Sequence, residues 1–325
     1  MNVRRRLISA AAVAAVAVLG AGTLSGCSRG PAVVANTSRF DVVASFYPMT
    51  FLAERIGGEH ARVTTLTSPG QEPHDLEISP RQIAQLEESD AVLYLKGLQP
   101  SVDEAVAQSP VGTKIDAAGL TTLEEHGTEV GGHAPGHDGH QDDSPAGEGE
   151  GAGKDPHIWL DPVKYAQVAE GVGKAFEKAD PAHAADYRKN TRTLVGELDA
   201  LDLEFRQGLA HTRGKVFLTT HAAFGYLAER YGLIEEAVNG LDPESEPSAA
   251  RVRDLERTAR ADGVSTVFYE TLVSDRTART LAHDTGLRTD VLDPIEGITG
   301  RSRGKDYLAV QQANLKALRQ ALGAK

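Results

Sequence analysis

The chain has 325 residues, 40% of which are hydrophobic, so it is long enough for about two domains with cores of their own. Its formal net charge at pH 7 is −12. Because an acidic surface repels phosphate groups, this charge argues against nucleic acid as a partner.

The first 26 residues have the pattern of an export signal. Three arginines at positions 4–6 precede a largely apolar stretch, which ends in Leu-Ser-Gly-Cys at residues 24–27. This ending, which contains the only cysteine, resembles a bacterial lipobox, in which the cysteine is lipidated and becomes the new N-terminus; a plain signal peptide with an incidental cysteine is the alternative. We therefore expect a signal peptide (1–26), a tether (27–38) and a soluble body that Cys27 anchors to the outer face of the cytoplasmic membrane.

Strand and helix patterns alternate from residue 40 onward. The β-rich runs cover residues 41–47, 61–67 and 91–97. Helical spacing follows the first run, and a second helix begins at Pro80 with Ser79 as its expected N-cap. This alternation predicts a parallel sheet covered by helices on both faces.

Residues 126–153 interrupt this order. They are rich in Gly, Pro and acidic residues, and they contain four of the eleven histidines in the chain: His126, His133, His137 and His140. The segment has no hydrophobic periodicity, so we expect a disordered insertion within an N-terminal α/β domain at 39–179.

The most regular pattern covers residues 180–211. Asp180 is the expected N-cap and Pro181 the expected first helical residue. Apolar residues then recur mostly three or four positions apart, at Tyr187, Leu194, Leu198, Leu201, Phe205 and Leu209. A helix of about 30 residues would span roughly 45 Å, which is enough to link two domains rigidly.

Alternation resumes over residues 212–325, the expected C-terminal α/β domain. Strands are predicted at 215–221, 264–270 and 289–294, with helices at 222–232 and from 305 onward. The sequences FLAERIG (51–57) and YLAERYG (226–232) each follow a β-rich run. The similarity of these two segments favours two similar α/β domains with mostly parallel sheets. Chance similarity between ordinary helix sequences is the alternative.

Three histidines stand where an α/β sheet places ligands. His74, His157 and His221 lie beyond strand ends or in proline-bounded loops, and such sheets bind ligands beyond the carboxyl ends of their strands. Any one of them alone would more often be a hydrogen-bonding loop residue. The other histidines outside the insertion, His60, His183, His211 and His283, have polar or helical surroundings and are expected at the surface.

Four sequence motifs are similar to those of a known family. The sequences PHDLEISP, DPHIWLDP, THAAFGYLAERYG and LDPIEG, in this order, resemble motifs of the zinc and manganese solute-binding lipoproteins of bacterial ABC importers, solute-binding protein family 9. The resemblance covers nearly the whole mature chain. It implies two α/β domains joined by one long linker helix, with a metal site in the interdomain cleft.

The resemblance also implies the ligands. Carried over by position, they are His74, His157 and His221, with a carboxylate after the last predicted strand as the fourth. Glu296 is the expected fourth ligand and Asp293 is the alternative. Glu77, one helical turn beyond the first of these histidines, is expected to act as a hydrogen-bond acceptor behind a ligand or as a helix cap.

Three imidazoles and one carboxylate suit Zn²⁺, whereas Mn²⁺ prefers more oxygen ligands. Manganese-binding members of the family tend to have a Glu where His221 stands, so this residue favours zinc. Cu²⁺ would also bind such a donor set tightly. Because the imidazoles must be neutral to bind, we expect the affinity to fall below about pH 6.

The predicted function is extracytoplasmic zinc capture and delivery to a membrane permease and its ATPase by a monomeric, lipid-anchored protein. The His-rich loop would gather zinc weakly. A manganese- or iron-binding component of the same transporter class is one alternative. A zinc hydrolase is another, with Asp155, Asp161 or Glu270 as the base, although Asp155 and Asp161 also suit simple turn or cap roles.

Overall fold

The structure is a computed structural model that describes residues 39–126, 154–245 and 247–324, all within one compact unit at Ser38–Lys325. The predicted signal peptide, tether and Cys27 lie outside the described residues, as do His133, His137 and His140. Among the helices of the described part, none is long and apolar enough to cross a bilayer.

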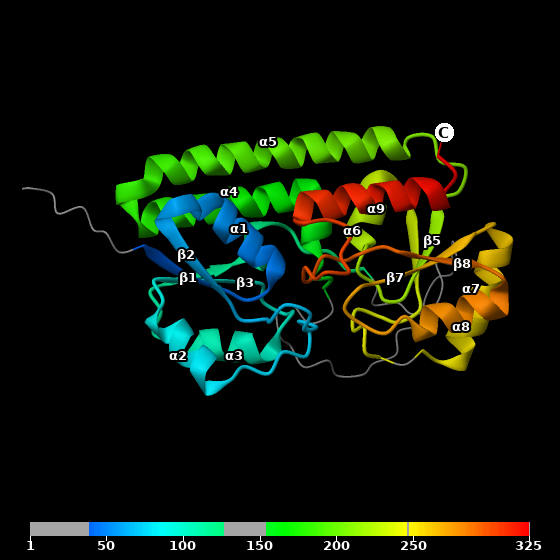
Figure 1. The fold of residues 1–325 in the computed structure, drawn as a ribbon, viewed down its shortest axis with the longest axis horizontal. Helices are drawn as coiled ribbons and strands as arrows, with labels where there is room; N and C mark the ends of the chain where they lie inside the picture. Colours follow the sequence, from blue (N-terminus) through cyan, green and yellow to red (C-terminus); the bar gives the residue numbers. More distant parts are fainter. Residues whose placement is uncertain (1–38, 127–153, 246, 325) are drawn as a thin grey trace, which may run out of the picture. The chain divides into compact units, whose positions relative to one another are not determined.

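The first sheet has four parallel strands in the order β2-β1-β3-β4 (Figure 1). Its strands are β1 (Phe40–Ala44), β2 (Ala61–Thr65), β3 (Ala91–Tyr94) and β4 (Thr113–Asp116). Its helices are α1 (Tyr47–Gly57), α2 (Pro80–Glu88) and α3 (Pro100–Gln108). Figure 1 shows α1 on one face and α2 and α3 on the other. Ser79 caps α2 in a reciprocal capping box with Gln82, which confirms the predicted N-cap.

The second sheet repeats this arrangement, with four parallel strands in the order β6-β5-β7-β8. Its strands are β5 (Val216–Thr219), β6 (Ile234–Ala237), β7 (Thr266–Tyr269) and β8 (Arg288–Val291). Its helices are α6 (Gly225–Tyr231), α7 (Ala249–Ala261), α8 (Arg276–Thr285) and α9 (Tyr307–Ala321). In each sheet the second strand lies outside the first, so the two halves share one topology. The prediction of two similar, parallel α/β halves is therefore confirmed.

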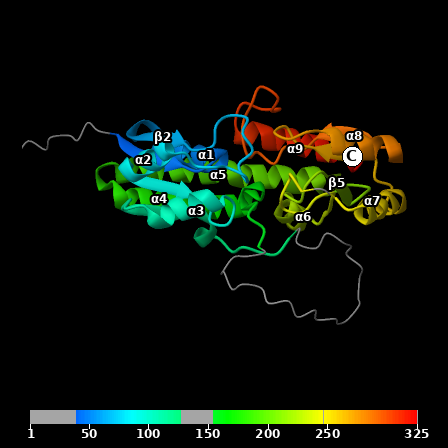
Figure 2. The same ribbon diagram turned by 90° about the horizontal axis from the view of Figure 1, so that it is seen from below.

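Two long helices lie side by side, and the longer of them runs along both halves (Figures 1 and 2). These are α4 (Pro162–Ala179) and α5 (Ala184–Leu209), and α5 contacts α1 of the first half and α9 of the second. All six residues of the predicted apolar stripe of α5 are buried. The predicted start of α5 was wrong. Pro181–His183 form a 3₁₀ turn, in which the Asp180 carboxylate accepts hydrogen bonds from His183 Nδ1 and the Tyr187 hydroxyl.

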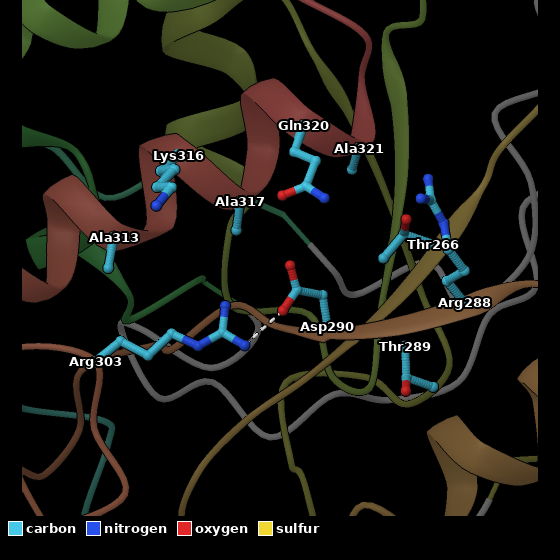
Figure 3. Close-up of a pocket in the computed structure, with 10 residues that line it drawn as sticks. All are labelled: Thr266, Arg288, Thr289, Asp290, Arg303, Ala313, Lys316, Ala317, Gln320 and Ala321. Carbon is cyan, nitrogen blue, oxygen red and sulfur yellow. Dashed lines mark hydrogen bonds and ion pairs between the residues drawn. The ribbon is translucent and has the colours of Figure 1, made fainter.

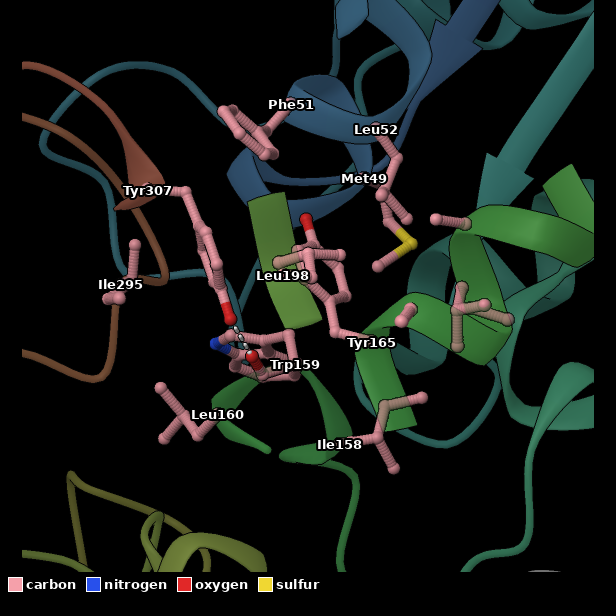
Figure 4. Close-up of a cluster of buried hydrophobic side chains, with 14 of the residues drawn as sticks. Met49, Phe51, Leu52, Ile158, Trp159, Leu160, Tyr165, Leu198, Ile295 and Tyr307 are labelled. Carbon is pink, nitrogen blue, oxygen red and sulfur yellow. Dashed lines mark hydrogen bonds between the residues drawn. The ribbon is translucent and has the colours of Figure 1, made fainter. Parts of the chain in front are cut away.

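A single apolar cluster joins the halves and supports the loops between them. Figure 4 shows Trp159 and Tyr307 within it. The Trp159 indole donates a hydrogen bond to the Pro294 carbonyl at 2.7 Å, and the Tyr307 hydroxyl donates to the Trp159 carbonyl. These bonds tie the 3₁₀ turn Ile158–Leu160 of the first half to the segment that follows β8 in the second. His157 and Glu296 flank the tied segments and are therefore held close to one another.

Candidate metal centre

His157 lies in a fixed orientation at the start of the 3₁₀ turn. One oxygen of the buried Asp155 carboxylate, Oδ1, accepts hydrogen bonds from the His157 backbone N–H at 2.9 Å and from its ring Nδ1 at 2.8 Å. With Nδ1 engaged, the ring presents Nε2, which is buried and has no hydrogen-bond partner among the described residues. A ring held in this way presents Nε2 as a metal ligand.

His221 is oriented in the same manner from the second half. It follows β5, and its Nδ1 donates to Oε1 of Glu270, which follows β7, at 2.8 Å. The Thr220 hydroxyl donates to the same oxygen. His221 Nε2 is also buried without a hydrogen-bond partner in the described part of the chain. The carboxyl ends of two neighbouring parallel strands therefore supply the imidazole and the acceptor that orients it.

His74 comes from the loop between β2 and α2 and is 12% exposed. Leu76, two residues further on, is buried against the core, and its carbonyl accepts a hydrogen bond from the Ser101 hydroxyl. These contacts anchor the loop. Of the three candidate histidines, His74 is the one that reaches the solvent, because the side chains of His157 and His221 are at most 2% exposed.

Glu296 lies at the centre of these three rings. Its Oε1 is 3.2 Å from His74 Nε2, 3.4 Å from His157 Nε2 and 3.7 Å from His221 Nε2. One ligand atom from each of the four residues lies within 4.8 Å of the others. The preceding residue, Ile295, has φ +60°, a left-handed conformation that an isoleucine rarely adopts. This turn of the chain brings the carboxylate toward the histidines.

Asp293 is not part of this group, and its carboxylate oxygens are engaged by other residues. Its Oδ1 accepts the Ile295 backbone N–H at 2.8 Å, and its Oδ2 accepts the Thr271 hydroxyl at 3.0 Å. Its backbone N–H and carbonyl are both bonded to Asn314. Asp293 therefore stabilises the turn that carries Glu296.

The charges within this group stabilise one another. Burial alone would lower the pKa of His157, but the hydrogen bond to Asp155 and the nearby Glu296 carboxylate raise it to about 10. Burial would also lower the pKa of His221, but the charge and hydrogen bond of Glu270, together with the charge of Glu296, raise it. Burial would raise the pKa of Glu296, yet the adjacent His157 ring and the hydrogen bond from His74 lower it. The group holds a proton where a cation would otherwise bind, so a metal ion must displace that proton.

Other residues singled out by the sequence occupy different positions. His126 lies in a second group with Glu124 and Glu229. His60 and His183 are partly exposed at the surface, as expected, and their rings stack with centroids 4.1 Å apart. Glu77 is exposed, and the nearby loop carboxylate that lies 4.0 Å from His74 Nε2 belongs to Glu72.

The orienting carboxylates were only partly anticipated. The sequence suggested turn or base roles for Asp155, Asp161 and Glu270. Asp161 caps α4 and forms an ion pair with Arg230. The proline-bounded motif around His157 is a signal for Asp155, but no local pattern pairs His221 with a residue 49 positions away.

A pocket of about 590 Å³ lies apart from this group, beside β8 and α9 (Figure 3). Its charged lining consists of Arg288, Lys316 and the ion pair between Arg303 and Asp290. None of the four clustered residues lines it. Its lining contains no histidine and a single carboxylate, Asp290, which pairs with Arg303, so the pocket offers no ligand set for the predicted metal.

Comparison with known proteins identifies the family of the chain. Residues 42–321 match the family described as zinc-uptake complex component A, periplasmic. The zinc-binding lipoprotein AdcA of Streptococcus pneumoniae is 31% identical over 288 residues, covering 87% of this chain but 56% of the relative. The chain thus spans just over half the length of that protein.

Two further relatives match along nearly their whole length. The high-affinity zinc uptake system protein ZnuA of Bacillus subtilis is 30% identical over 290 residues, covering 87% of this chain and 88% of the relative. The crystal structure of the Zn(II)-bound ZnuA-like domain of S. pneumoniae AdcA has a TM-score of 0.71 and 30% identity, covering 88% of this chain and 99% of that one. The chain therefore belongs to the zinc-uptake complex component A family.

Proposed function

We propose that this protein captures Zn²⁺ outside the cytoplasm for an ABC importer, with His74, His157, His221 and Glu296 as its ligands. The observation that carries this proposal is the spacing of the ligand atoms. A tetrahedral zinc ion with bonds of about 2.0–2.1 Å separates its ligand atoms by about 3.3–3.4 Å. The three distances from Glu296 Oε1 to the histidine Nε2 atoms, 3.2, 3.4 and 3.7 Å, are close to that value.

The donor set favours zinc over manganese or iron. Three of its four atoms are imidazole nitrogens, whereas harder ions prefer more oxygen. His221 supplies the nitrogen that distinguishes this set from an oxygen-rich one, and its Nε2 is buried beside Glu296. Relatives named for zinc binding or zinc uptake support the same choice.

Binding without catalysis fits the site better than hydrolysis does. A hydrolytic zinc site needs an open position for water and a free base nearby. Here, four residues supply a closed set of ligands. The candidate bases are engaged elsewhere: Asp155 and Glu270 accept from ring Nδ1 atoms, and Asp161 pairs with Arg230.

The remaining assignments rest on the sequence motifs and on the similarity to the relatives described above. We assign residues 1–26 to a signal peptide and Cys27 to lipid attachment at the outer face of the cytoplasmic membrane, in keeping with a relative named as a lipoprotein. Residues 39–179 and 212–325 would form two domains, joined by residues 180–211. The protein would act as a monomer and pass zinc to a membrane permease driven by an ATPase. The His-rich insertion would gather zinc for the site.

Ligand replacement with native mass spectrometry tests the proposal. The mature protein should retain one tightly bound zinc ion, and His157→Ala, His221→Ala or Glu296→Ala should each weaken binding by at least about 100-fold. Asp293→Asn is the matched control. Its amide oxygen can still accept the Ile295 N–H hydrogen bond, so zinc affinity should stay within about threefold. A parent protein without bound zinc, or a zinc loss confined to Asp293→Asn, would contradict the assignment.

A further inference from the structure

A second group of ligand atoms lies on the far side of Asp155. It consists of Glu124, His126 and Glu229, whose ligand atoms all lie within 4.8 Å of one another. His126 Nε2 is 2.9 Å from Glu229 Oε2. The group is more open than the first, since Glu229 is 61% exposed and His126 is 20% exposed.

The Asp155 carboxylate lies between the two groups and faces one imidazole with each oxygen. Its Oδ1 accepts from His157 Nδ1, as described above. Its Oδ2 is fully buried, lies 3.2 Å from His126 Nδ1 and has no hydrogen-bond partner in the described chain. A metal ion on His126 Nε2 would leave the proton on Nδ1, from where it can donate to Oδ2. Occupation of the second group would thus fix the His126 tautomer that pairs with this buried acceptor.

The local backbone is built to hold His126 in this place. The Asp155 N–H donates to the Glu124 carbonyl at 2.9 Å. The Tyr226 hydroxyl accepts from the Glu124 N–H and donates to the Asp155 carbonyl, both at 2.8 Å. The His126 ring packs edge-on against Tyr226 and over Gly225, where a Cβ atom would lie 2.4 Å from His126 Cβ.

The charge of this region also suits a divalent cation. Three carboxylates, those of Glu124, Asp155 and Glu229, surround the imidazole. Lys164 Nζ lies 2.6 Å from Glu124 Oε1 and neutralises one of these charges. Asp155 and Glu229 have no lysine or arginine partner among the described residues, so a divalent ion would add positive charge where carboxylates are in excess.

We propose that Glu124, His126 and Glu229 form a second divalent-cation site, more exposed and weaker than the buried one, which takes borderline ions such as Zn²⁺. Asp155 orients the histidine of each site through its Nδ1. The second site uses none of the ligands of the buried site, and its existence does not depend on the transport role proposed above.

Zinc titration of the full mature chain by isothermal calorimetry tests this site. The background variant carries His133→Ala, His137→Ala and His140→Ala, so that the other histidines of the insertion cannot bind zinc. We expect two equivalents of Zn²⁺, one tight and one weaker. Glu229→Gln and His126→Gln should each weaken the second equivalent by at least about tenfold and leave the first within about threefold. The intact first equivalent reports that each variant is folded.

Two controls separate this site from general acidity and from the buried site. Glu125→Gln removes an exposed charge beside the site and should change neither equivalent. His221→Ala should remove the first equivalent and spare the second, so a failure of the buried site is told apart from a failure of this one. A single equivalent in the background variant would overturn the proposal, as would a second equivalent that is insensitive to both His126→Gln and Glu229→Gln.

Discussion

Replacing Glu270 should weaken zinc binding in graded steps, although this residue is not a proposed ligand. Its Oε1 accepts the His221 Nδ1 hydrogen bond at 2.8 Å, and the two side chains are at most 3% exposed. In Glu270→Gln, an amide oxygen can still accept this bond, but the negative charge is lost. In Glu270→Ala, the buried N–H loses its partner altogether.

The magnitudes follow from these two losses. Removing the acceptor behind a ligating histidine typically weakens metal binding by about 10–100-fold. We therefore expect about tenfold weaker binding for Glu270→Gln and about 100-fold for Glu270→Ala, which correspond to about 1.4 and 2.7 kcal/mol. The alanine variant should also lose about 1–3 kcal/mol of zinc-free stability, because it leaves a buried donor unpaired.

Competition with a chromophoric zinc chelator measures the affinities, and urea unfolding of the zinc-free protein measures stability. Glu235→Gln is the matched control. Glu235 is a partly buried carboxylate of the same half, but it accepts from the Thr219 hydroxyl and the Phe224 N–H instead of a histidine. Its replacement should leave zinc affinity within about twofold. Equal affinities for the parent, Glu270→Gln and Glu270→Ala would refute the reasoning, as would an equal loss in Glu235→Gln.

Two further predictions concern protons and packing. The pKa of His157, about 10 in the zinc-free protein, lies above its unfolded value of about 6.5. Its protonation therefore stabilises the zinc-free fold fully below about pH 6.5, and this contribution is lost as the pH rises through 10. Zinc affinity should accordingly rise about tenfold per pH unit between about pH 7 and 9, and chelator competition that gave a flat profile would contradict this. Trp159→Phe leaves the Pro294 carbonyl without its donor and should cost about 1–3 kcal/mol in urea unfolding; a change below about 0.5 kcal/mol would show that the bond contributes little.

The pH dependence of zinc binding could be predicted only in part from the sequence. An unperturbed imidazole loses its proton near pH 6.5, which led to the expectation of weakened binding below about pH 6. The structure surrounds His157 with two carboxylates, Asp155 and Glu296, one of them 139 residues further along the chain. No local sequence pattern identifies such distant neighbours. The shift to higher pH of the range over which zinc affinity changes could therefore not be predicted.

Local patterns predicted several elements but missed the helices α3, α7 and α8. Ser79 and Pro80 marked the start of α2, and the apolar stripe of α5 matched its buried face. The edge strands β4 and β6 were missed, because each has only four residues, most of them partly exposed, and little apolar content. The predicted start of α5 was wrong because Pro181 suits a 3₁₀ turn as well as an α-helix.

The choice between Asp293 and Glu296 depended on backbone geometry. Both carboxylates follow β8, and the sequence alone left them as alternatives. The left-handed conformation of Ile295 sends one toward the histidines and leaves the other bonded to Thr271 and Asn314. Isoleucine rarely adopts such a conformation, so the residue type does not predict the left-handed turn.

The shared apolar cluster has a consequence for how this protein unfolds. It contains strand residues of both sheets, such as Leu93 and Phe217, together with Phe205 of α5. Neither half could therefore melt alone without exposing apolar surface that belongs to both. The two repeats should lose structure in one cooperative transition, and a fragment cut within α5 should be unable to persist as an independent folding unit.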